Sequence, residues 1–176
     1  MLNELFFEDR RLRIEYKNIL ASPYYSEVII DIIDRYLHDY AFHNNLTLQT
    51  ILKSYNHFTS TYLIGINDFI TTGLYPYELG KKNALDRIDY DIALLLSPAV
   101  TIHRHRILKN LMKCVSIIEG KVLLIGLGSG LELEILNNFC SNADVEAYDV
   151  SISDFVRSRF TNNIIVEGEF TGRSSY

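Results

Sequence analysis

The sequence predicts an α/β protein, with an amino-terminal all-α helical domain over residues 1–118 and a parallel β-α-β-α-β half-sheet over residues 119–176. Apolar residues recur at helical spacing in the first part, whereas short apolar runs alternate with helical segments in the second. Residue types divide at the same place, because ten of the twelve tyrosines precede residue 91 and four of the nine glycines lie within residues 120–130. The two parts are expected to pack together, since no Pro-rich or Ser-rich linker separates them.

Helices are expected in the first part over residues 3–20, 22–40, 47–71, 86–96 and 98–118. The second is the clearest, because Ser22 is a good N-cap, Pro23 fits the first helical position, and apolar residues then follow at spacings of three and four. The third contains Gly65, a residue at which a helix can break. Two glycines and a proline within residues 72–80 predict a loop there.

After Gly120 the spacing becomes that of short strands. Residues 121–125 form a continuous apolar run that ends at a glycine, which is typical of a parallel strand covered on both faces. A helix, a strand, a helix and a strand are expected to follow, over residues 131–139, 145–149, 153–159 and 163–167. Strands that alternate with helices predict parallel pairing through right-handed crossovers, as in a doubly wound sheet.

Composition and charge exclude several classes of protein. The chain of 176 residues is 48% hydrophobic and 22% charged, and it has no apolar run near the ~18 residues of a membrane span. A net charge of -5 provides no general attraction to nucleic acid or anionic lipid. Two cysteines are too few for a disulfide framework or a structural zinc site, and the start lacks a signal-peptide pattern. We expect a reduced, cytoplasmic protein that binds no metal, nucleic acid or membrane.

A glycine-rich loop at the end of the first predicted strand is the main indication of a ligand-binding site. Its residues are Gly126, Leu127, Gly128, Ser129 and Gly130. Glycines at this position let a ligand approach the backbone, and the helix that follows points free N–H groups at it, so we expect a nucleotide-type ligand. The dinucleotide fingerprint would require glycine at position 131, where Leu131 stands, and this disfavours NAD.

The strand and glycine loop together resemble the Rossmann-like class I S-adenosylmethionine-dependent methyltransferases. The resemblance covers residues 121–170 and implies that the loop wraps the methionyl part of S-adenosylmethionine. It also implies that Asp149, which ends the second strand and precedes Val150, holds both ribose hydroxyls. Glu169, after the third strand, matches an acidic residue near the adenine amino group. The chain departs from the family at Leu124, where an acidic residue is usual.

The sheet is shorter than the family pattern. In that pattern the strand at residues 121–125 lies in the middle of the sheet, so here it would form an open edge that is apolar on both faces. Such an edge is a template for aggregation unless another strand pairs with it. We expect either a homo-oligomer or the carboxyl-terminal half of a longer chain to complete the sheet, and we expect the 176 residues alone to be inactive.

The resemblance implies an S-adenosylmethionine-dependent transferase that methylates a small molecule. One alternative is aminocarboxypropyl transfer, as in nicotianamine synthase-like enzymes, to whose Pro-Tyr loop Pro76-Tyr77 is similar. Another is a cofactor-binding or assembly module without catalysis. Tyr75 and Tyr77 are candidates for an aromatic lid over the substrate, against the simpler interpretation of two packed rings that hold a loop. No catalytic base is predicted.

One further motif is the basic stretch His103-Arg104-His105-Arg106. It could bind an anion or supply a general base. Adjacent helical residues point in different directions, however, and cannot converge on one atom. A solvated helix face is therefore the favoured interpretation.

Overall fold

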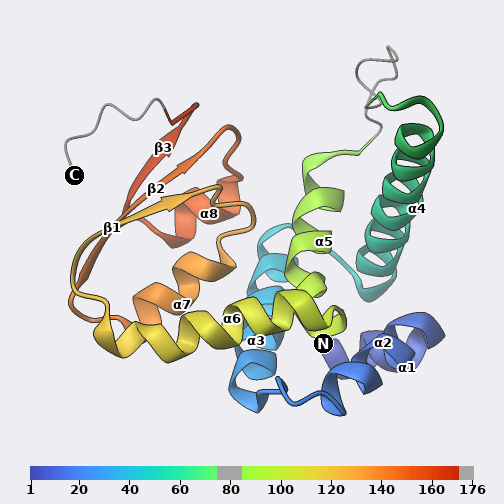
Figure 1. The fold of residues 1–176 in the computed structure, drawn as a ribbon, viewed down its shortest axis with the longest axis horizontal. Helices are drawn as coiled ribbons and strands as arrows, with labels where there is room; N and C mark the ends of the chain where they lie inside the picture. The colour runs from blue at the N-terminus through green and yellow to red at the C-terminus, as the bar shows by residue number, and fades with distance from the viewer. Residues whose placement is uncertain (75–84, 171–176) are drawn as a thin grey trace.

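The computed structural model describes residues 1–74 and 85–170. In these residues six α-helices precede a three-stranded parallel sheet, and two more helices connect its strands (Figure 1). The helices of the first part are α1 (Leu2–Glu8), α2 (Arg10–Leu20), α3 (Glu27–His43), α4 (Leu48–Thr72), α5 (Arg87–Val100) and α6 (Ile102–Cys114). This arrangement confirms the mixed α/β class.

The beginning of the helical part differs from the sequence prediction at two places. The single helix expected over residues 3–20 is divided at Asp9, whose carboxylate accepts hydrogen bonds from the N–H groups of Arg11 and Leu12 and so caps α2. The next helix begins at Glu27 rather than at Ser22, because the Ser22 hydroxyl accepts the Tyr24 N–H in a local turn. Both errors come from short side chains that bond nearby backbone.

Helix boundaries later in the first part were also shifted. Helix α4 continues through Gly65 without a break. The boundary expected at Pro98 lies instead at Thr101, and α5 contains the proline. Pro98 cannot donate to the Leu94 carbonyl, but the Ser97 hydroxyl does so at 2.9 Å. This substitute hydrogen bond lets the helix continue past the proline.

The second part has the predicted β-α-β-α-β order. Its elements are β1 (Gly120–Ile125), α7 (Leu131–Phe139), β2 (Ala143–Asp149), α8 (Asp154–Arg159) and β3 (Ile164–Glu167). All pairs are parallel in the order β1-β2-β3, with Val122 opposite Val145 and Ala147 opposite Ile165. The carboxyl ends of the strands therefore meet at one edge of the sheet.

Within the described residues only one face of this sheet is covered by helices. The side chains that pack against the core are Val122, Leu124, Val145, Ala147 and Ile165. On the opposite face Ile125 and Ile164 are each 57% exposed. Both crossovers move across the sheet in the same direction, and right-handed crossovers then place α7 and α8 on the same side. The expectation of a doubly wound sheet, covered on both faces, is therefore wrong for this part of the chain.

One continuous core joins the two parts across the predicted boundary at residue 119. It includes Leu37 and Leu95 from the helical part and Leu133 and Val145 from the sheet part. Helix α4 lies on the side of α5 remote from the sheet (Figure 1). No helix among the described residues is long and apolar enough to span a bilayer.

His105 corrects the interpretation of the basic stretch. His103 and Arg106 are exposed, but His105 is fully buried. Its Nε2 accepts the Ser26 N–H at 3.1 Å, and its Nδ1 lies 2.8 Å from the Pro98 carbonyl oxygen, so the proton of a neutral ring belongs on Nδ1. His105 therefore joins α6 to α5 and to the start of α3 as a neutral side chain.

Acid is expected to destabilise the protein through His105. Burial lowers the pKa of this imidazole below its usual value of 6.5, and the nearby Lys109 lowers it further. Because the unfolded state takes up the proton first, the stability that depends on the neutral ring is present above about pH 6.5 and is lost as the pH falls below it. The slope is at most about 1.4 kcal/mol per pH unit for one proton. Urea titrations between pH 7.5 and 5 should show a steeper fall for the wild type than for His105→Gln.

His103→Gln is the matched control, since His103 is exposed on the same helix. It should keep the wild-type pH dependence. Equal slopes for the wild type and His105→Gln would show that His105 is not the group responsible.

Candidate functional site

The glycine loop lies at the carboxyl end of β1, beside the end of β2. The N–H groups of Gly126 and Leu127 both donate to the Tyr148 carbonyl, at 2.9 and 3.3 Å. The Gly130 N–H then donates to the Leu127 carbonyl at 2.9 Å, which closes the turn into α7. All three glycines of the loop have positive φ. The predicted strand-loop-helix unit is present.

Asp149 is the last residue of β2, and its carboxylate is held over the loop. One oxygen, Oδ2, accepts the Gly128 N–H at 2.7 Å, and the other, Oδ1, accepts the Ser151 N–H at 3.1 Å. Each carboxylate oxygen can accept more than one hydrogen bond, so both oxygens keep acceptor positions for a ligand. The structure thus brings together the two features on which the sequence interpretation rests.

Two of the three loop glycines lie against the helical part. A Cβ atom on Gly128 would lie 2.8 Å from Leu94 Cδ1 in α5, and one on Gly130 would lie 2.7 Å from the Tyr36 hydroxyl in α3. A side chain at either position needs its neighbour to move. The end of the Leu94 side chain can shift, whereas Tyr36 is buried and bonded to the Ser129 carbonyl. A Cβ on Gly126 would meet nothing within 4 Å. Of these glycines, Gly126 is the one whose surroundings leave room for a ligand.

The loop residues between the glycines direct their side chains inward. Leu127 is 1% exposed and belongs to the core, and Ser129 is 3% exposed. The Ser129 carbonyl accepts the Tyr36 hydroxyl at 2.8 Å. A ligand at this loop would therefore contact backbone atoms of Leu127 and Ser129 rather than their side chains.

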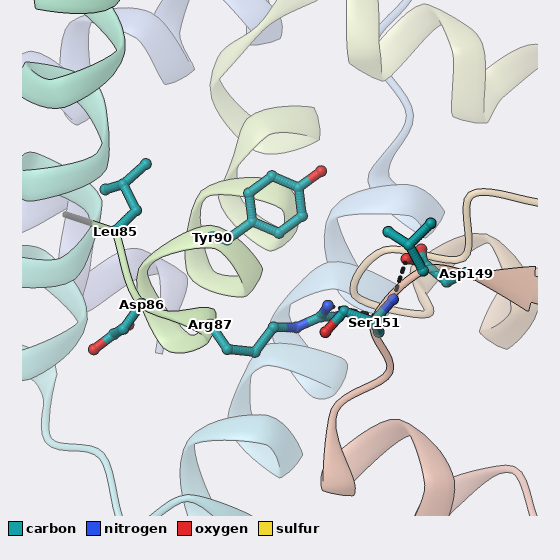
Figure 2. A pocket seen from close by; sticks show the side chains of 7 residues that line it. Leu85, Asp86, Arg87, Tyr90, Asp149 and Ser151 are labelled. Carbon is teal, nitrogen blue, oxygen red and sulfur yellow. Dashed lines mark hydrogen bonds between the residues drawn. The ribbon is translucent and has the colours of Figure 1, made fainter. Parts of the chain in front are cut away.

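A pocket of about 350 Å³ opens beside Asp149 (Figure 2). The start of α5 forms one wall and the residues that end and follow β2 form the other. Its lining residues are Leu85, Asp86, Arg87, Tyr90, Asp149, Val150 and Ser151. Val150 is 70% exposed and Tyr90 is 43% exposed, so both present apolar surface that a bound ring could cover.

Arg87 is a central residue of the site that the sequence analysis missed. Its Nη1 donates to the Ser151 carbonyl at 2.7 Å, and its Nη2 donates to the Gly128 carbonyl at 2.8 Å. Its Nε lies 2.9 Å from Oδ1 of Asp91, a fully buried carboxylate. Figure 2 shows the Arg87 side chain extending from the start of α5 toward Ser151.

The surroundings of Asp91 explain how this ion pair is held. Burial raises the pKa of the Asp91 carboxyl, and the Arg87 guanidinium opposes that rise. The other carboxylate oxygen accepts the Tyr40 hydroxyl at 3.2 Å. A signal for this pair was present in the sequence, because Asp91 lies four residues after Arg87 and four before the core residue Leu95. An acid within the apolar stripe of a helix indicates a buried partner.

A second polar pair was also missed. His57 Nδ1 in α4 lies 2.6 Å from Oδ2 of Asp89 in α5. Asp89 is buried, and its N–H donates to Asp86, which caps α5. The pair links α4 to α5. Among the residues that the structure describes, no group of three or more His, Cys, Asp or Glu side chains is arranged to hold a metal ion.

Of the predicted site residues that the structure describes, only Asp149 and Val150 line this pocket, and the loop residues Gly126 to Gly130 lie outside its lining. Glu169 follows β3, is exposed, and is absent from the lining of the pocket. Its neighbour Glu167 pairs with Arg157. Tyr75 and Tyr77 lie outside the described residues, so their predicted contact with substrate stays a prediction.

Comparison with known proteins found no relative: no family model, no curated protein and no solved structure matches this chain. The functional interpretation therefore depends on the residues of the site.

Proposed function

We propose that the pocket beside Asp149 binds S-adenosylmethionine in a Rossmann-like half-sheet. The observation that carries the proposal is the Asp149 carboxylate, fixed at the carboxyl end of β2 next to the glycine loop and lining a pocket of about 350 Å³. A carboxylate with free acceptor positions suits the adjacent hydroxyls of a ribose, because it can accept from both together. Val150 and Tyr90 line the same pocket and would offer apolar contact to the adenine ring.

The charges around α7 favour a nucleoside without phosphate over a dinucleotide. A diphosphate bound at this loop would lie at the N-terminus of the helix. The first turn of α7 carries Glu132 and Glu134, which pair with Arg104 at 3.2 Å and with Arg159 at 2.8 Å. Among the described residues, these pairs occupy the positive charges next to the start of α7. S-adenosylmethionine has no phosphate, so this arrangement does not oppose its binding.

The reaction we propose is methyl transfer to a small molecule. A lone pair of the acceptor forms a bond to the methyl carbon while the carbon–sulfur bond breaks, and its electrons return to sulfur to give S-adenosylhomocysteine. A proton of the acceptor is released to a base or to solvent. Because the sulfonium methyl is already electrophilic, the protein contributes mainly by holding the two reactants in line. The alternative of aminocarboxypropyl transfer depends on Pro76 and Tyr77, which lie outside the described residues.

Calorimetry with S-adenosylhomocysteine and NAD tests the proposal. We expect a dissociation constant in the micromolar range for S-adenosylhomocysteine, about -8 kcal/mol, and no comparable affinity for NAD. Methionine serves as a control ligand that lacks the nucleoside. Tighter binding of NAD than of S-adenosylhomocysteine would contradict the assignment.

The open side of the sheet predicts association. Within the described residues β1 pairs with β2 alone, so its outer edge presents backbone groups without a strand partner, and Ile125 and Ile164 are exposed on the uncovered face. We propose that a second copy of this chain or additional strands cover this region. Light scattering on the 176-residue chain should give a mass above the 20.3 kDa of one molecule. A stable monomer at high concentration would contradict this prediction.

A further inference from the structure

Arg87 and Asp149 are connected through the same two backbone residues. Gly128 donates its N–H to Asp149 Oδ2 at 2.7 Å, and its carbonyl accepts from Arg87 Nη2 at 2.8 Å. Ser151 repeats the pattern, because its N–H donates to Asp149 Oδ1 at 3.1 Å and its carbonyl accepts from Arg87 Nη1 at 2.7 Å. These four hydrogen bonds, together with the backbone of Gly128 and Ser151, close a ring through four residues. The two residues whose N–H groups orient the carboxylate are thus held through their own carbonyl groups by one guanidinium.

The guanidinium itself is fixed from the helical part. Asp91, one turn further along α5, pairs with Arg87 Nε and is fully buried. Tyr40 in α3 donates to the same carboxylate. The Arg87 guanidinium also lies 5.9 Å from the centre of the Tyr90 ring, at the wall of the pocket. Asp91 and Tyr40 belong to packed helices and hold the Arg87 guanidinium in place. Through its bonds to the Gly128 and Ser151 carbonyls, Arg87 in turn restrains the loop.

We propose that Arg87 is a positioning residue, which orients the Asp149 carboxylate toward the ligand through Gly128 and Ser151. For its ligand this inference rests on the proposed binding of S-adenosylmethionine. For its mechanism it rests on the hydrogen bonds that join Arg87, Gly128, Asp149 and Ser151. The cofactor site therefore needs a side chain from residues 1–118, although the glycine loop and Asp149 both belong to the sheet part.

The role requires a guanidinium. Its two Nη atoms carry N–H donors in a rigid fork, so they can reach two carbonyls while Nε faces Asp91. A lysine ammonium keeps the charge that Asp91 needs, but its three donors lie on one nitrogen, which cannot take the places of Nη1, Nη2 and Nε together. Arg87→Lys is therefore the informative variant. Arg87→Ala would leave Asp91 buried without a counter-charge and could prevent folding.

A double-mutant cycle tests the connection. The variants are Arg87→Lys, Asp149→Ala and the two combined, and calorimetry measures the affinity of each for S-adenosylhomocysteine. We expect Arg87→Lys alone to weaken binding by about 10-fold, a typical effect of losing a charged hydrogen bond. In the Asp149→Ala background the same substitution should change the affinity less than about 2-fold, because no carboxylate remains to be oriented. Arg11→Lys, which removes a guanidinium bond to Asn56 far from the site, is the control and should leave the affinity unchanged.

Amide exchange in the ligand-free protein provides a readout that does not depend on the cofactor. We expect Arg87→Lys to accelerate exchange of the Gly128 and Ser151 amides, whereas Arg11→Lys leaves both unchanged. If Arg87→Lys does not fold, Arg87→Met combined with Asp91→Asn removes both charges together and takes its place.

The outcomes separate this inference from the proposed function. Wild-type protein that binds no S-adenosylhomocysteine, together with accelerated exchange in Arg87→Lys, would refute the cofactor and support the positioning of Asp149. Unchanged exchange at Gly128 and Ser151 would overturn the role of Arg87, whatever the ligand. The role of Arg87 would also be overturned if Arg87→Lys weakened the binding of S-adenosylhomocysteine equally in the wild type and in the Asp149→Ala variant.

Discussion

Asp149→Ala is expected to weaken the binding of S-adenosylhomocysteine by about 10- to 150-fold. The carboxylate would accept two ribose hydroxyls, and the loss of a charged hydrogen-bond acceptor costs about 1.5 to 3 kcal/mol. The variant should also melt a few degrees lower without ligand, because the N–H groups of Gly128 and Ser151 lose their acceptor. Calorimetry and thermal denaturation measure the two effects separately.

Asp144→Ala is the matched control for this prediction. Asp144 lies on the same strand, is exposed, and is absent from the lining of the pocket. Its replacement should change neither the affinity nor the melting temperature appreciably. An Asp149→Ala variant with wild-type affinity would place the ribose elsewhere.

Gly130→Ala should produce the largest loss of stability among substitutions in the loop. Gly130 has a φ of 84°, a left-handed conformation that costs a residue with a side chain about 1 to 2 kcal/mol. The new methyl group would also lie 2.7 Å from the Tyr36 hydroxyl and 2.9 Å from the Phe160 ring. Displacing these buried groups brings the expected total to about 3 kcal/mol, which lowers the melting temperature by about 6 to 12 °C.

Gly120→Ala separates the two causes of this loss. Gly120 has a φ of 75°, but a Cβ atom there would meet nothing within 4 Å. It should therefore show the conformational cost alone, about 1 to 2 kcal/mol. Equal losses for the two variants would show that the contacts with Tyr36 and Phe160 relax at no cost.

The sheet part was predicted well because its signals are local. Helix α7 has the predicted bounds, and the observed strands begin and end within two residues of the predicted ones. Short apolar runs that end at glycine or at a polar residue leave little freedom in where a strand stops. The exposure of one sheet face was not predictable in this way, because it depends on which direction the crossovers take.

The helical part was predicted less well because capping competes with periodicity. Asp9 and Ser22 lie near helix ends, and the apolar pattern continues past both. Whether such a side chain bonds to the amide groups of a helix ahead of it or to a local turn is decided by small differences in backbone geometry. The apolar pattern predicts which segments are helical, but it predicts neither the division of the first helix at Asp9 nor the first residue of α3.

The candidate site, too, could be predicted where its signals are local and not where it depends on distant residues. The meeting of Asp149 and the glycine loop could be predicted, since the carboxyl ends of parallel strands lie at one edge. The contacts of Arg87 with Gly128 and Ser151 could not be predicted, because they span 41 and 64 residues of sequence. The sequence also could not separate Gly126, which faces open space, from Gly130, which is required by the packing of Tyr36.

The packing of the loop against the helices has a consequence for how related sequences can vary. A side chain at position 130 would displace Tyr36, Phe160 and Val156 together, and a smaller residue at position 36 would also remove the hydroxyl that bonds the Ser129 carbonyl. A side chain at position 128 would likewise meet Leu94, but shortening Leu94 would break no side-chain hydrogen bond. Gly130 should therefore be kept wherever Tyr36, Phe160 and Val156 are kept, whereas residue 94 can shorten on its own. Substitutions in the helical part are thus limited by a loop that lies far away in the sequence.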